Sequence, residues 1–222
     1  MQHILLANSV SYATPSGGQV LTGLDMALHP GELAWVRGPS GGGKSTLLRL
    51  LTRLISPDSG RIALSGQPIE AIPPASLRRQ VALVAQTPVM ASGTVEHNLT
   101  LSFSLRAASG ASPPSADALA QWLERLSLTG VKLSDQAQTL SVGQKQRVAL
   151  ARSLIMEPKV LLLDEPVSAL DQDSRLVIER MAGEYREREG RAVIMVSHIE
   201  PNPDAGPVRV YNLENGKLQE QA

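Results

Sequence analysis

Cysteine is absent from this 222-residue sequence, and Phe, Trp and Tyr together make up only 3% of the residues. Without cysteine the chain can form neither disulfide bonds nor thiolate metal sites, so thiol redox chemistry is excluded. The aromatic residues are too few to form the base-stacking surface of a protein that binds single-stranded nucleic acid.

An excess of either charge sign is also missing, because 21 Lys and Arg residues balance 21 Asp and Glu residues. A net charge of zero creates no overall field that would attract nucleic acid or anionic lipid. We therefore expect no nucleic-acid partner, and any anion-binding site has to be local.

Long apolar runs are absent as well. No stretch approaches the roughly 18 apolar residues of a membrane span. The opening segment MQHILLANSV lacks the basic region and long apolar run of a signal peptide. We expect a chain in the cytoplasm that contacts a membrane only through a partner.

The sequence does contain short β-rich runs that alternate with longer helical patterns, which is typical of a mostly parallel sheet covered by helices. The pattern predicts a helix over Lys44–Ile55 and a closing hairpin around Asn215 and Gly216. A small-residue, proline-rich surface loop is expected over Ala107–Ala116. Val193–Ser197 is expected to be the last parallel strand. The strands expected before it are Leu33–Arg37, Arg61–Ser65, Val81–Ala85 and Val160–Asp164.

A phosphate-binding loop stands between the first of these strands and the predicted helix. Its residues match G-x-x-x-x-G-K-[ST]. Glycines let consecutive backbone N–H groups surround phosphate oxygens, and the following helix adds the positive end of its dipole. Lys44 supplies a mobile charge for the β- and γ-phosphates, and the Ser45 hydroxyl suits Mg²⁺. The nucleotide-binding residues are therefore Gly38, Pro39, Ser40, Gly41, Gly42, Gly43, Lys44, Ser45 and Thr46.

Two carboxylates, Asp164 and Glu165, end a buried apolar strand. A charged turn after a core strand is common, so this pair alone favours neither structure nor function. Together with a phosphate loop the pair favours nucleotide hydrolysis, because ligands gather at the carboxyl ends of parallel strands. Asp164 is expected to reach Mg²⁺, and Glu165 is expected to orient an attacking water and accept its proton.

The segment Leu140-Ser141-Val142-Gly143-Gln144, followed by KQRVALARSL, resembles the signature of ATP-binding cassette (ABC) ATPases. The resemblance covers essentially the whole chain: Gln86 is similar to the family's Q-loop residue, His198 to its switch histidine, and Ser168, Ala169, Leu170 and Asp171 to its D-loop. It implies a P-loop NTPase fold of ABC type, with an N-terminal antiparallel β region and an inserted helical lobe. One domain, 1–222, would comprise a catalytic core (1–87 and 154–222) and a helical subdomain (88–153).

The resemblance also implies the cofactors, the catalytic set and a partner. ATP and Mg²⁺ are expected, with Ser45, Gln86 and Asp164 at the metal and with Glu165, His198, Gln86 and Lys44 in catalysis. A second copy would bind head to tail, so that Ser141, Val142, Gly143 and Gln144 act on the ATP of the partner. The common His-Asp pair is His198-Ile199 here, which removes a neighbouring acid.

Tyr12 lies in the segment VSYATPSGGQVLTGLDMALHPGE, which resembles the antiparallel strands that open the family fold. A half-buried strand tyrosine is the simplest interpretation without the family. With the family, we predict that the Tyr12 ring stacks on adenine.

Two kinds of function remain open: the motor of a membrane transporter, and a soluble ABC ATPase of DNA repair or translation. Repair cassettes carry long coiled coils and translation cassettes carry two copies, and neither pattern is visible here. The signature also argues against a metabolic kinase. The G-T-V-x-x-N-L segment after Gln86 is similar to exporters, and the whole pattern resembles Fet-type cassettes linked to iron export. This predicts that the chain lies at the cytoplasmic face of the inner membrane, where it binds a separate integral-membrane permease. The alternative is an ABC ATPase for a different cargo, of the importer type or of the lipid or lipoprotein type.

Overall fold

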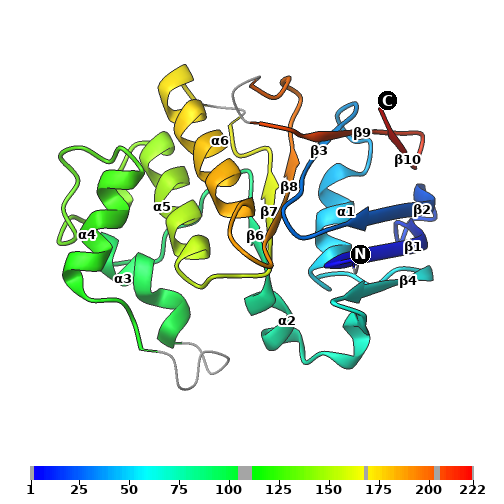
Figure 1. Ribbon diagram of the computed structural model, residues 1–222, viewed down its shortest axis with the longest axis horizontal. Helices are drawn as coiled ribbons and strands as arrows, with labels where there is room; N and C mark the ends of the chain where they lie inside the picture. The colour runs from blue at the N-terminus through cyan, green and yellow to red at the C-terminus, as the bar shows by residue number, and fades with distance from the viewer. Residues whose placement is uncertain (1–2, 105–111, 168–169, 203–205, 222) are drawn as a thin grey trace.

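The computed structural model describes residues 3–104, 112–167, 170–202 and 206–221. A small antiparallel sheet lies at one end of the molecule, helices α3, α4 and α5 gather at the other end, and a larger sheet lies between them (Figure 1). The helices are α1 (Lys44–Leu51), α2 (Pro74–Gln80), α3 (Val95–Thr100), α4 (Ala116–Arg125), α5 (Val142–Leu154) and α6 (Gln172–Arg186). Helix and sheet thus form the expected α/β fold.

The larger sheet has the order β10-β9-β3-β8-β7-β6. Its strands are β3 (Leu33–Arg37), β6 (Val81–Val84), β7 (Val160–Asp164), β8 (Ala192–Val196), β9 (Arg209–Glu214) and β10 (Lys217–Glu220). Strands β6, β7, β8 and β3 pair in parallel, so their carboxyl ends meet at one edge of the sheet.

The smaller sheet has the order β2-β1-β4-β5 and is antiparallel throughout. Its strands are β1 (Leu5–Ala13), β2 (Gln19–Leu28), β4 (Ser59–Leu64) and β5 (Gln67–Pro68). The antiparallel pairing of β1 with β2 confirms the N-terminal β region expected from the resemblance. The strand expected over Arg61–Ser65 belongs to this sheet and not to the parallel one.

The core forms two clusters, one on each face of the larger sheet. Along β3, Ala34 and Val36 face the leucines of α1, while Leu33 and Trp35 face α5 and α6. This alternation follows from the two-residue period of a strand. All four side chains are at most 2% exposed, as expected for a strand covered by helices on both faces.

Helix α1 ends at Leu51, four residues before the predicted end at Ile55, and that prediction is wrong. Arg53 adopts a left-handed backbone conformation with φ 53°, and the N–H of Leu54 donates to the carbonyl of Arg49. This is the hydrogen-bond pattern of a Schellman motif, with arginine in the place that glycine usually takes. The helix therefore ends before the proline and glycine that suggested its boundary.

A second correction concerns the end of the chain. The closing hairpin is confirmed, because β9 and β10 pair antiparallel and Asn215 and Gly216 both have positive φ. However, β9 also pairs in parallel with β3, so Val193–Ser197 does not contain the last parallel strand. A turn signal specifies the partner across the turn and carries no information on the other edge of the strand.

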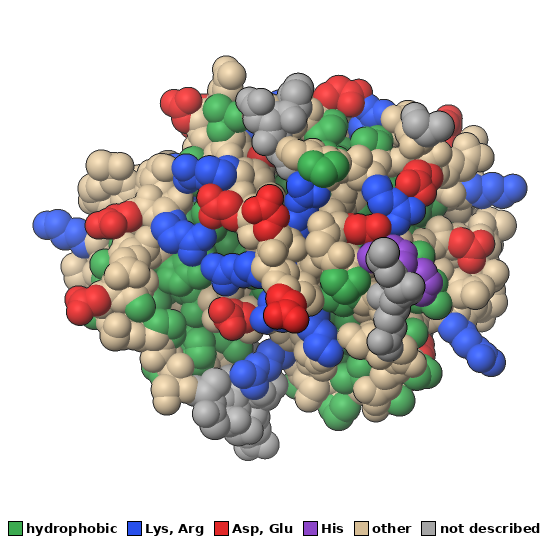
Figure 2. All heavy atoms as spheres, viewed as in Figure 1, with side chains coloured by type: hydrophobic (Ala, Val, Ile, Leu, Met, Phe, Trp, Pro, Cys, Tyr) green, Lys and Arg blue, Asp and Glu red, His purple; other side chains and the backbone are tan. Residues whose placement is uncertain are grey.

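The surface carries no concentrated charge on the face drawn in Figure 2, where acidic and basic side chains are interspersed. Within the described ranges, no helix is long and apolar enough to cross a membrane. Residues 107–111 of the expected surface loop lie outside the described residues.

Candidate active site

The residues selected from the sequence follow four neighbouring parallel strands at the same edge of the larger sheet. The phosphate loop follows β3, Glu165 follows β7, Gln86 follows β6 and His198 follows β8. Lys44 and His198, which are 154 residues apart in sequence, thereby meet in space. This edge is where ligands bind in open parallel sheets.

The phosphate loop leads into α1 through Gly43, the residue before the helix, whose backbone is left-handed with φ 95°. No side chain caps α1, and its first turn carries no acidic residue. The positive end of the helix dipole is therefore left for a ligand. At the start of the loop, a side chain on Gly38 would overlap the carbonyl oxygen of Leu213 in β9.

Lys44, the first residue of α1, is 4% exposed. Its Nζ donates to the carbonyls of Gly38 (2.9 Å) and Pro39 (2.8 Å), so the lysine at the end of the loop binds the backbone at its start. Burial lowers the pKa of the Lys44 ammonium, and the nearby carboxylates of Glu165 and Asp164 oppose this shift. The ammonium is thus a buried cation held beside two acids.

Glu165 is the centre of a polar cluster. Its Oε1 lies 2.7 Å from Nε2 of His198 and 3.9 Å from Nζ of Lys44, and its Oε2 accepts a hydrogen bond of 3.0 Å from Nε2 of Gln86. The Glu165 backbone is left-handed, with φ 45°, and its N–H donates to the carbonyl of Val196 in β8. A non-glycine residue held in this region marks a conformation imposed by its surroundings. The four predicted catalytic residues therefore meet.

Ser45 and Asp164 meet beside this cluster, where the Ser45 hydroxyl donates to Oδ1 of Asp164 at 3.0 Å. Burial raises the pKa of the Asp164 carboxyl, the hydrogen bond from Ser45 opposes this shift, and the negative charge of Glu165 adds to it. A hydroxyl and a carboxylate are the hard oxygen ligands that Mg²⁺ prefers, and protein Mg²⁺ sites use few such ligands together with phosphates and water. Within the described ranges no group of three or more His, Cys, Asp or Glu side chains forms a metal site on its own. The donor set therefore fits Mg²⁺ bound together with a nucleotide.

Tyr12 lies on β1, and its partner residue on the neighbouring strand β2 lies against the phosphate loop. Tyr12 lies opposite Leu21 across the β1–β2 pair. A side chain on Gly43 would approach Leu21 and Val20 to 3.0 Å, which places β2 directly against the phosphate loop. The Tyr12 side chain is partly buried and packs against the core cluster that contains Leu21.

The signature segment forms the start of α5. The Ser141 hydroxyl accepts from the N–H of Gln144, whose side chain accepts from the N–H of Ser141, and these two bonds form a capping box. Gly143 faces Ser174 and Leu170 at the start of α6. Figure 1 shows α5 well apart from α1. The structure does not place the signature in the Glu165 cluster of the same chain; Ser168 and Ala169 lie outside the described residues.

Gln146 was not selected from the sequence, yet it connects the signature helix to the cluster. Its side chain is 2% exposed, and its Nε2 donates to the carbonyl of Ala85, the residue before Gln86. A buried polar group inside a helix is the signal that could have revealed it. The sequence does not show that Gln146 is buried, because the four consecutive polar residues Gln144–Arg147 cover every side of that part of α5.

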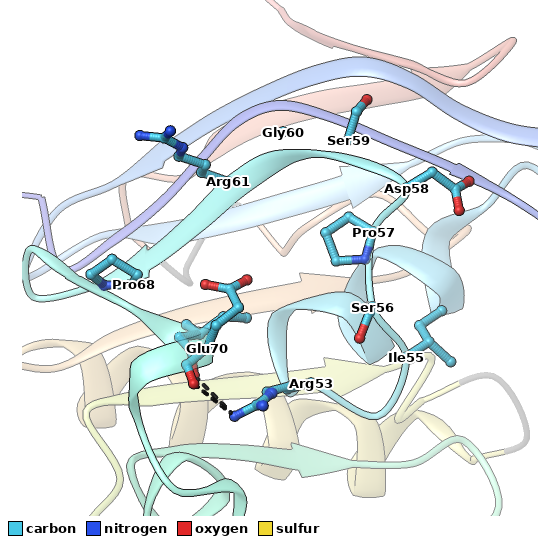
Figure 3. A pocket seen from close by; sticks show the side chains of 11 residues that line it. Arg53, Ile55, Ser56, Pro57, Asp58, Ser59, Gly60, Arg61, Pro68 and Glu70 are labelled. Carbon is cyan, nitrogen blue, oxygen red and sulfur yellow. Dashed lines mark hydrogen bonds between the residues drawn. The ribbon is translucent and has the colours of Figure 1, made fainter.

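A separate pocket of about 410 Å³ lies at the opposite end of α1 (Figure 3). Its wall includes Arg53, whose Nη1 donates to the carbonyls of Glu70 (3.3 Å) and Ile72 (3.0 Å). None of the residues selected for nucleotide binding or catalysis lines this pocket. It is distinct from the Glu165 cluster.

A parallel sheet with a phosphate loop after one strand, and with an acidic pair after another, defines a nucleotide-hydrolysing P-loop protein. The model of the family described as ABC transporter matches residues 21–168. The chain belongs to this family. It is the ATP-hydrolysing component of an ABC transporter, it uses ATP with Mg²⁺, and its hydrolysis of ATP is coupled to transport.

Two curated relatives illustrate the similarity. "Probable iron export ATP-binding protein FetA" of Escherichia coli (strain K12) is 36% identical over 195 residues, which cover 88% of this chain and 84% of that protein. "Protein STAR1" of Oryza sativa subsp. japonica is 43% identical over 183 residues, which cover 82% of this chain. The chain spans only 51% of the length of STAR1 and 32% of "Antigen peptide transporter 2" of Homo sapiens.

Solved structures show the same fold. An ATP-bound exporter of the bacterial Atm1 family has a TM-score of 0.81 and 29% identity over 99% of this chain and 38% of that chain. CbiO1 from Clostridium perfringens, part of the ABC transporter complex cbiONQ, has a TM-score of 0.79 and 30% identity over 99% of this chain and 88% of that chain. These findings confirm the fold class expected from the resemblance.

Proposed function

We propose that this chain is the motor of an exporter, that it acts through a separate permease at the cytoplasmic face of the inner membrane, and that the cargo is iron or another metal ion. The observation that carries this proposal is the similarity to FetA, because the two chains align over 84% of FetA. The similarities to an antigen peptide transporter and to an Atm1-family exporter support export more broadly.

The G-T-V-x-x-N-L segment, which is similar to that of exporters, forms one local structure. Thr94 caps α3 by accepting from the N–H of His97, and Val95 and Leu99 are buried. Asn98 is fully buried and bonds through its side chain to both backbone groups of Ala91. The segment lies near the start of the helical subdomain (88–153), shortly after Gln86 in the chain. We propose that this subdomain receives the permease.

Hydrolysis follows from the geometry of Glu165. The carboxylate orients a water molecule in line with the γ-phosphate and accepts its proton as the new O–P bond forms and the bond to the ADP oxygen breaks. Lys44 and the backbone N–H groups of the loop stabilise the transferred phosphoryl group. Ser45, Asp164 and Gln86 would hold Mg²⁺, which when bound would neutralise phosphate charge.

The contacts of Glu165 link the carboxylate to the groups that we propose bind the γ-phosphate. Lys44 and His198, which both contact Glu165, are also the groups proposed to face the γ-phosphate. Glu165 and the γ-phosphate therefore share Lys44 and His198 as partners, and the histidine lies between the carboxylate that holds the water and the phosphate that the water attacks.

A second copy of the chain completes the site. The side chain of His198 is 42% exposed, so the cluster is open on one side. The start of α5, with Ser141, Val142, Gly143 and Gln144, lies away from the cluster of its own chain, and Val142 is 56% exposed. Helix N-termini favour anions, so a head-to-tail pair would place each signature against the ATP held by the other copy.

Reconstitution of the complex tests export. We expect the chain to purify with the permease encoded by the neighbouring gene and, in inside-out vesicles, to accumulate Fe²⁺ inside only when ATP is present. The same complex with Glu165→Gln is the control and is expected to accumulate none. ATP-driven loss of Fe²⁺ from preloaded inside-out vesicles would indicate an importer, and the absence of any permease would favour the soluble ABC ATPase.

Substitution of Tyr12 tests adenine recognition. Tyr12→Ala is expected to weaken ATP binding about tenfold, because stacking of one base on an aromatic ring contributes roughly 1–3 kcal/mol. It is also expected to remove the preference for ATP over GTP in calorimetry. Tyr12→Phe keeps the ring and should bind as the wild type does. Unchanged affinity in Tyr12→Ala would make Tyr12 a packing residue only.

A further inference from the structure

Trp35 lies in the middle of β3, three residues before the phosphate loop begins, and its side chain is completely buried. Its indole N–H donates a hydrogen bond of 3.0 Å to the carbonyl oxygen of Ile199. Ile199 directly follows His198 in the chain. A residue that the sequence presents as ordinary packing thus holds the backbone beside the histidine of the active site.

The segment after His198 is held at several points. The N–H of Ile199 donates to the Ser197 hydroxyl at 3.1 Å, and the carbonyl of Glu200 accepts from the guanidinium of Arg175 in α6 at 2.6 Å. Arg37, which is on the same face of β3 as Trp35, forms an ion pair with the Glu200 carboxylate. Strand β3 and helix α6 therefore fix the backbone on which His198 stands.

His198 itself has little packing to hold it, because its side chain is 42% exposed. Its Nε2 nevertheless lies 2.7 Å from Glu165 and 3.4 Å from Nζ of Lys44. Such short contacts require an accurately placed backbone, and a displacement of about 1 Å is enough to reduce a catalytic rate severely. Ile199 takes the position of the acid found in the common His-Asp pair, so no side chain at that position can anchor the histidine by charge.

We propose that Trp35 is a positioning residue for ATP turnover: by holding the carbonyl of Ile199, its indole N–H keeps the His198 imidazole beside Glu165. This proposal rests on the proposed roles of His198 and Glu165. The bond joins the strand that leads into the phosphate loop to the segment that carries the histidine. Trp35 thus sets the distance between the two parts of the site that have to meet the same phosphate.

The test removes the indole N–H in two ways, one of which also keeps the volume of the ring. Trp35→Phe is the simple variant, and benzothienylalanine at position 35 is the isosteric one, because sulfur replaces the N–H. Tyr185→Phe is the matched control. Tyr185 is 2% exposed, packs in the same core cluster, and donates to the carbonyl of Pro158 at the opposite edge of the sheet. Each substitution removes one buried hydrogen bond to a carbonyl.

Both Trp35 variants are expected to lower kcat for ATP at least about fivefold with KM unchanged, because a neutral hydrogen bond corresponds to roughly that factor. The imidazole ¹⁵N resonances of His198 should shift in the nucleotide-free protein. Tyr185→Phe should lower Tm by about as much as the Trp35 variants do, because it also removes one hydrogen bond. It should change neither kcat nor the His198 resonances. Equal kcat in the benzothienylalanine protein and the wild type, or unshifted His198 resonances, would overturn the proposal. A wild-type protein without ATPase activity would instead contradict the proposed function. In that case the His198 resonances would still show whether the hydrogen bond from Trp35 to Ile199 positions the imidazole.

Discussion

Glu165→Gln is expected to reduce ATP hydrolysis by roughly 10²–10⁴-fold, which is the contribution of a general base. The amide has the size of the carboxylate but cannot accept the proton of the attacking water. Binding of ATP should be unchanged or tighter, because the substitution removes a carboxylate that lies 3.9 Å from Nζ of Lys44 and competes with the phosphate. Single-turnover phosphate release and calorimetry measure the two effects.

The same variant should form a stable dimer when ATP is added. An ATP molecule that is not hydrolysed keeps the phosphate loop of one copy bound to the signature of the other. Size-exclusion chromatography with ATP should show a species of twice the 23.7 kDa chain mass, and ADP should not produce it. If only monomer elutes with ATP, the head-to-tail pair is wrong.

Glu157→Gln is a suitable control for this experiment. Glu157 also has a left-handed backbone, with φ 50°, and its carboxylate lies near Arg188 and Arg191. It precedes β7 and so lies at the edge of the sheet opposite Glu165. The control should hydrolyse ATP at the wild-type rate. An equal loss in both variants would assign the effect to folding and not to catalysis.

Lys44→Ala is expected to weaken ATP binding roughly a hundredfold, because one or two hydrogen bonds to charged phosphate groups, each worth about 1.5–3 kcal/mol, are lost. A second effect adds to the first. The Lys44 ammonium binds the carbonyls of Gly38 and Pro39, so the substitution also removes the group that holds the loop in shape. Calorimetry with ATP and Mg²⁺ measures the affinity.

Arg61→Ala removes one positive charge from the exposed wall of the pocket at the far end of α1 and is the matched control. It should leave ATP affinity unchanged, because Arg61 lies outside the phosphate loop. ATP affinity in Lys44→Ala that equals that of the wild type would contradict the assignment of the phosphate loop. A similar loss in both variants would indicate a general effect of charge.

The sequence predicted some features well because their signals are local. The bounds of the strands Leu33–Arg37 and Val160–Asp164 are confirmed, since apolar residues between charged or glycine-rich turns mark both ends. The end of α1 was predicted wrongly, since Arg53 adopts a left-handed conformation that arginine rarely takes. Its guanidinium donates to the carbonyl of Ile72, and a contact between residues this far apart leaves no local signal. The parallel pairing of β9 with β3 has no local signal at all.

The motifs by themselves indicated the class of this protein: glycine spacing around Lys44 specified a phosphate loop, and the segment Leu140–Gln144 resembles the ABC signature. The balanced charge meant only that an anion site had to be local. The phosphate loop can be recognised from the sequence because its residues lie within one turn and the helix that follows it. Only the tertiary structure decided that Gln86, Glu165 and His198 meet, and that Trp35 holds the segment beside the histidine. These contacts join separate strands, so their geometry depends on strand order and packing, which no local pattern encodes.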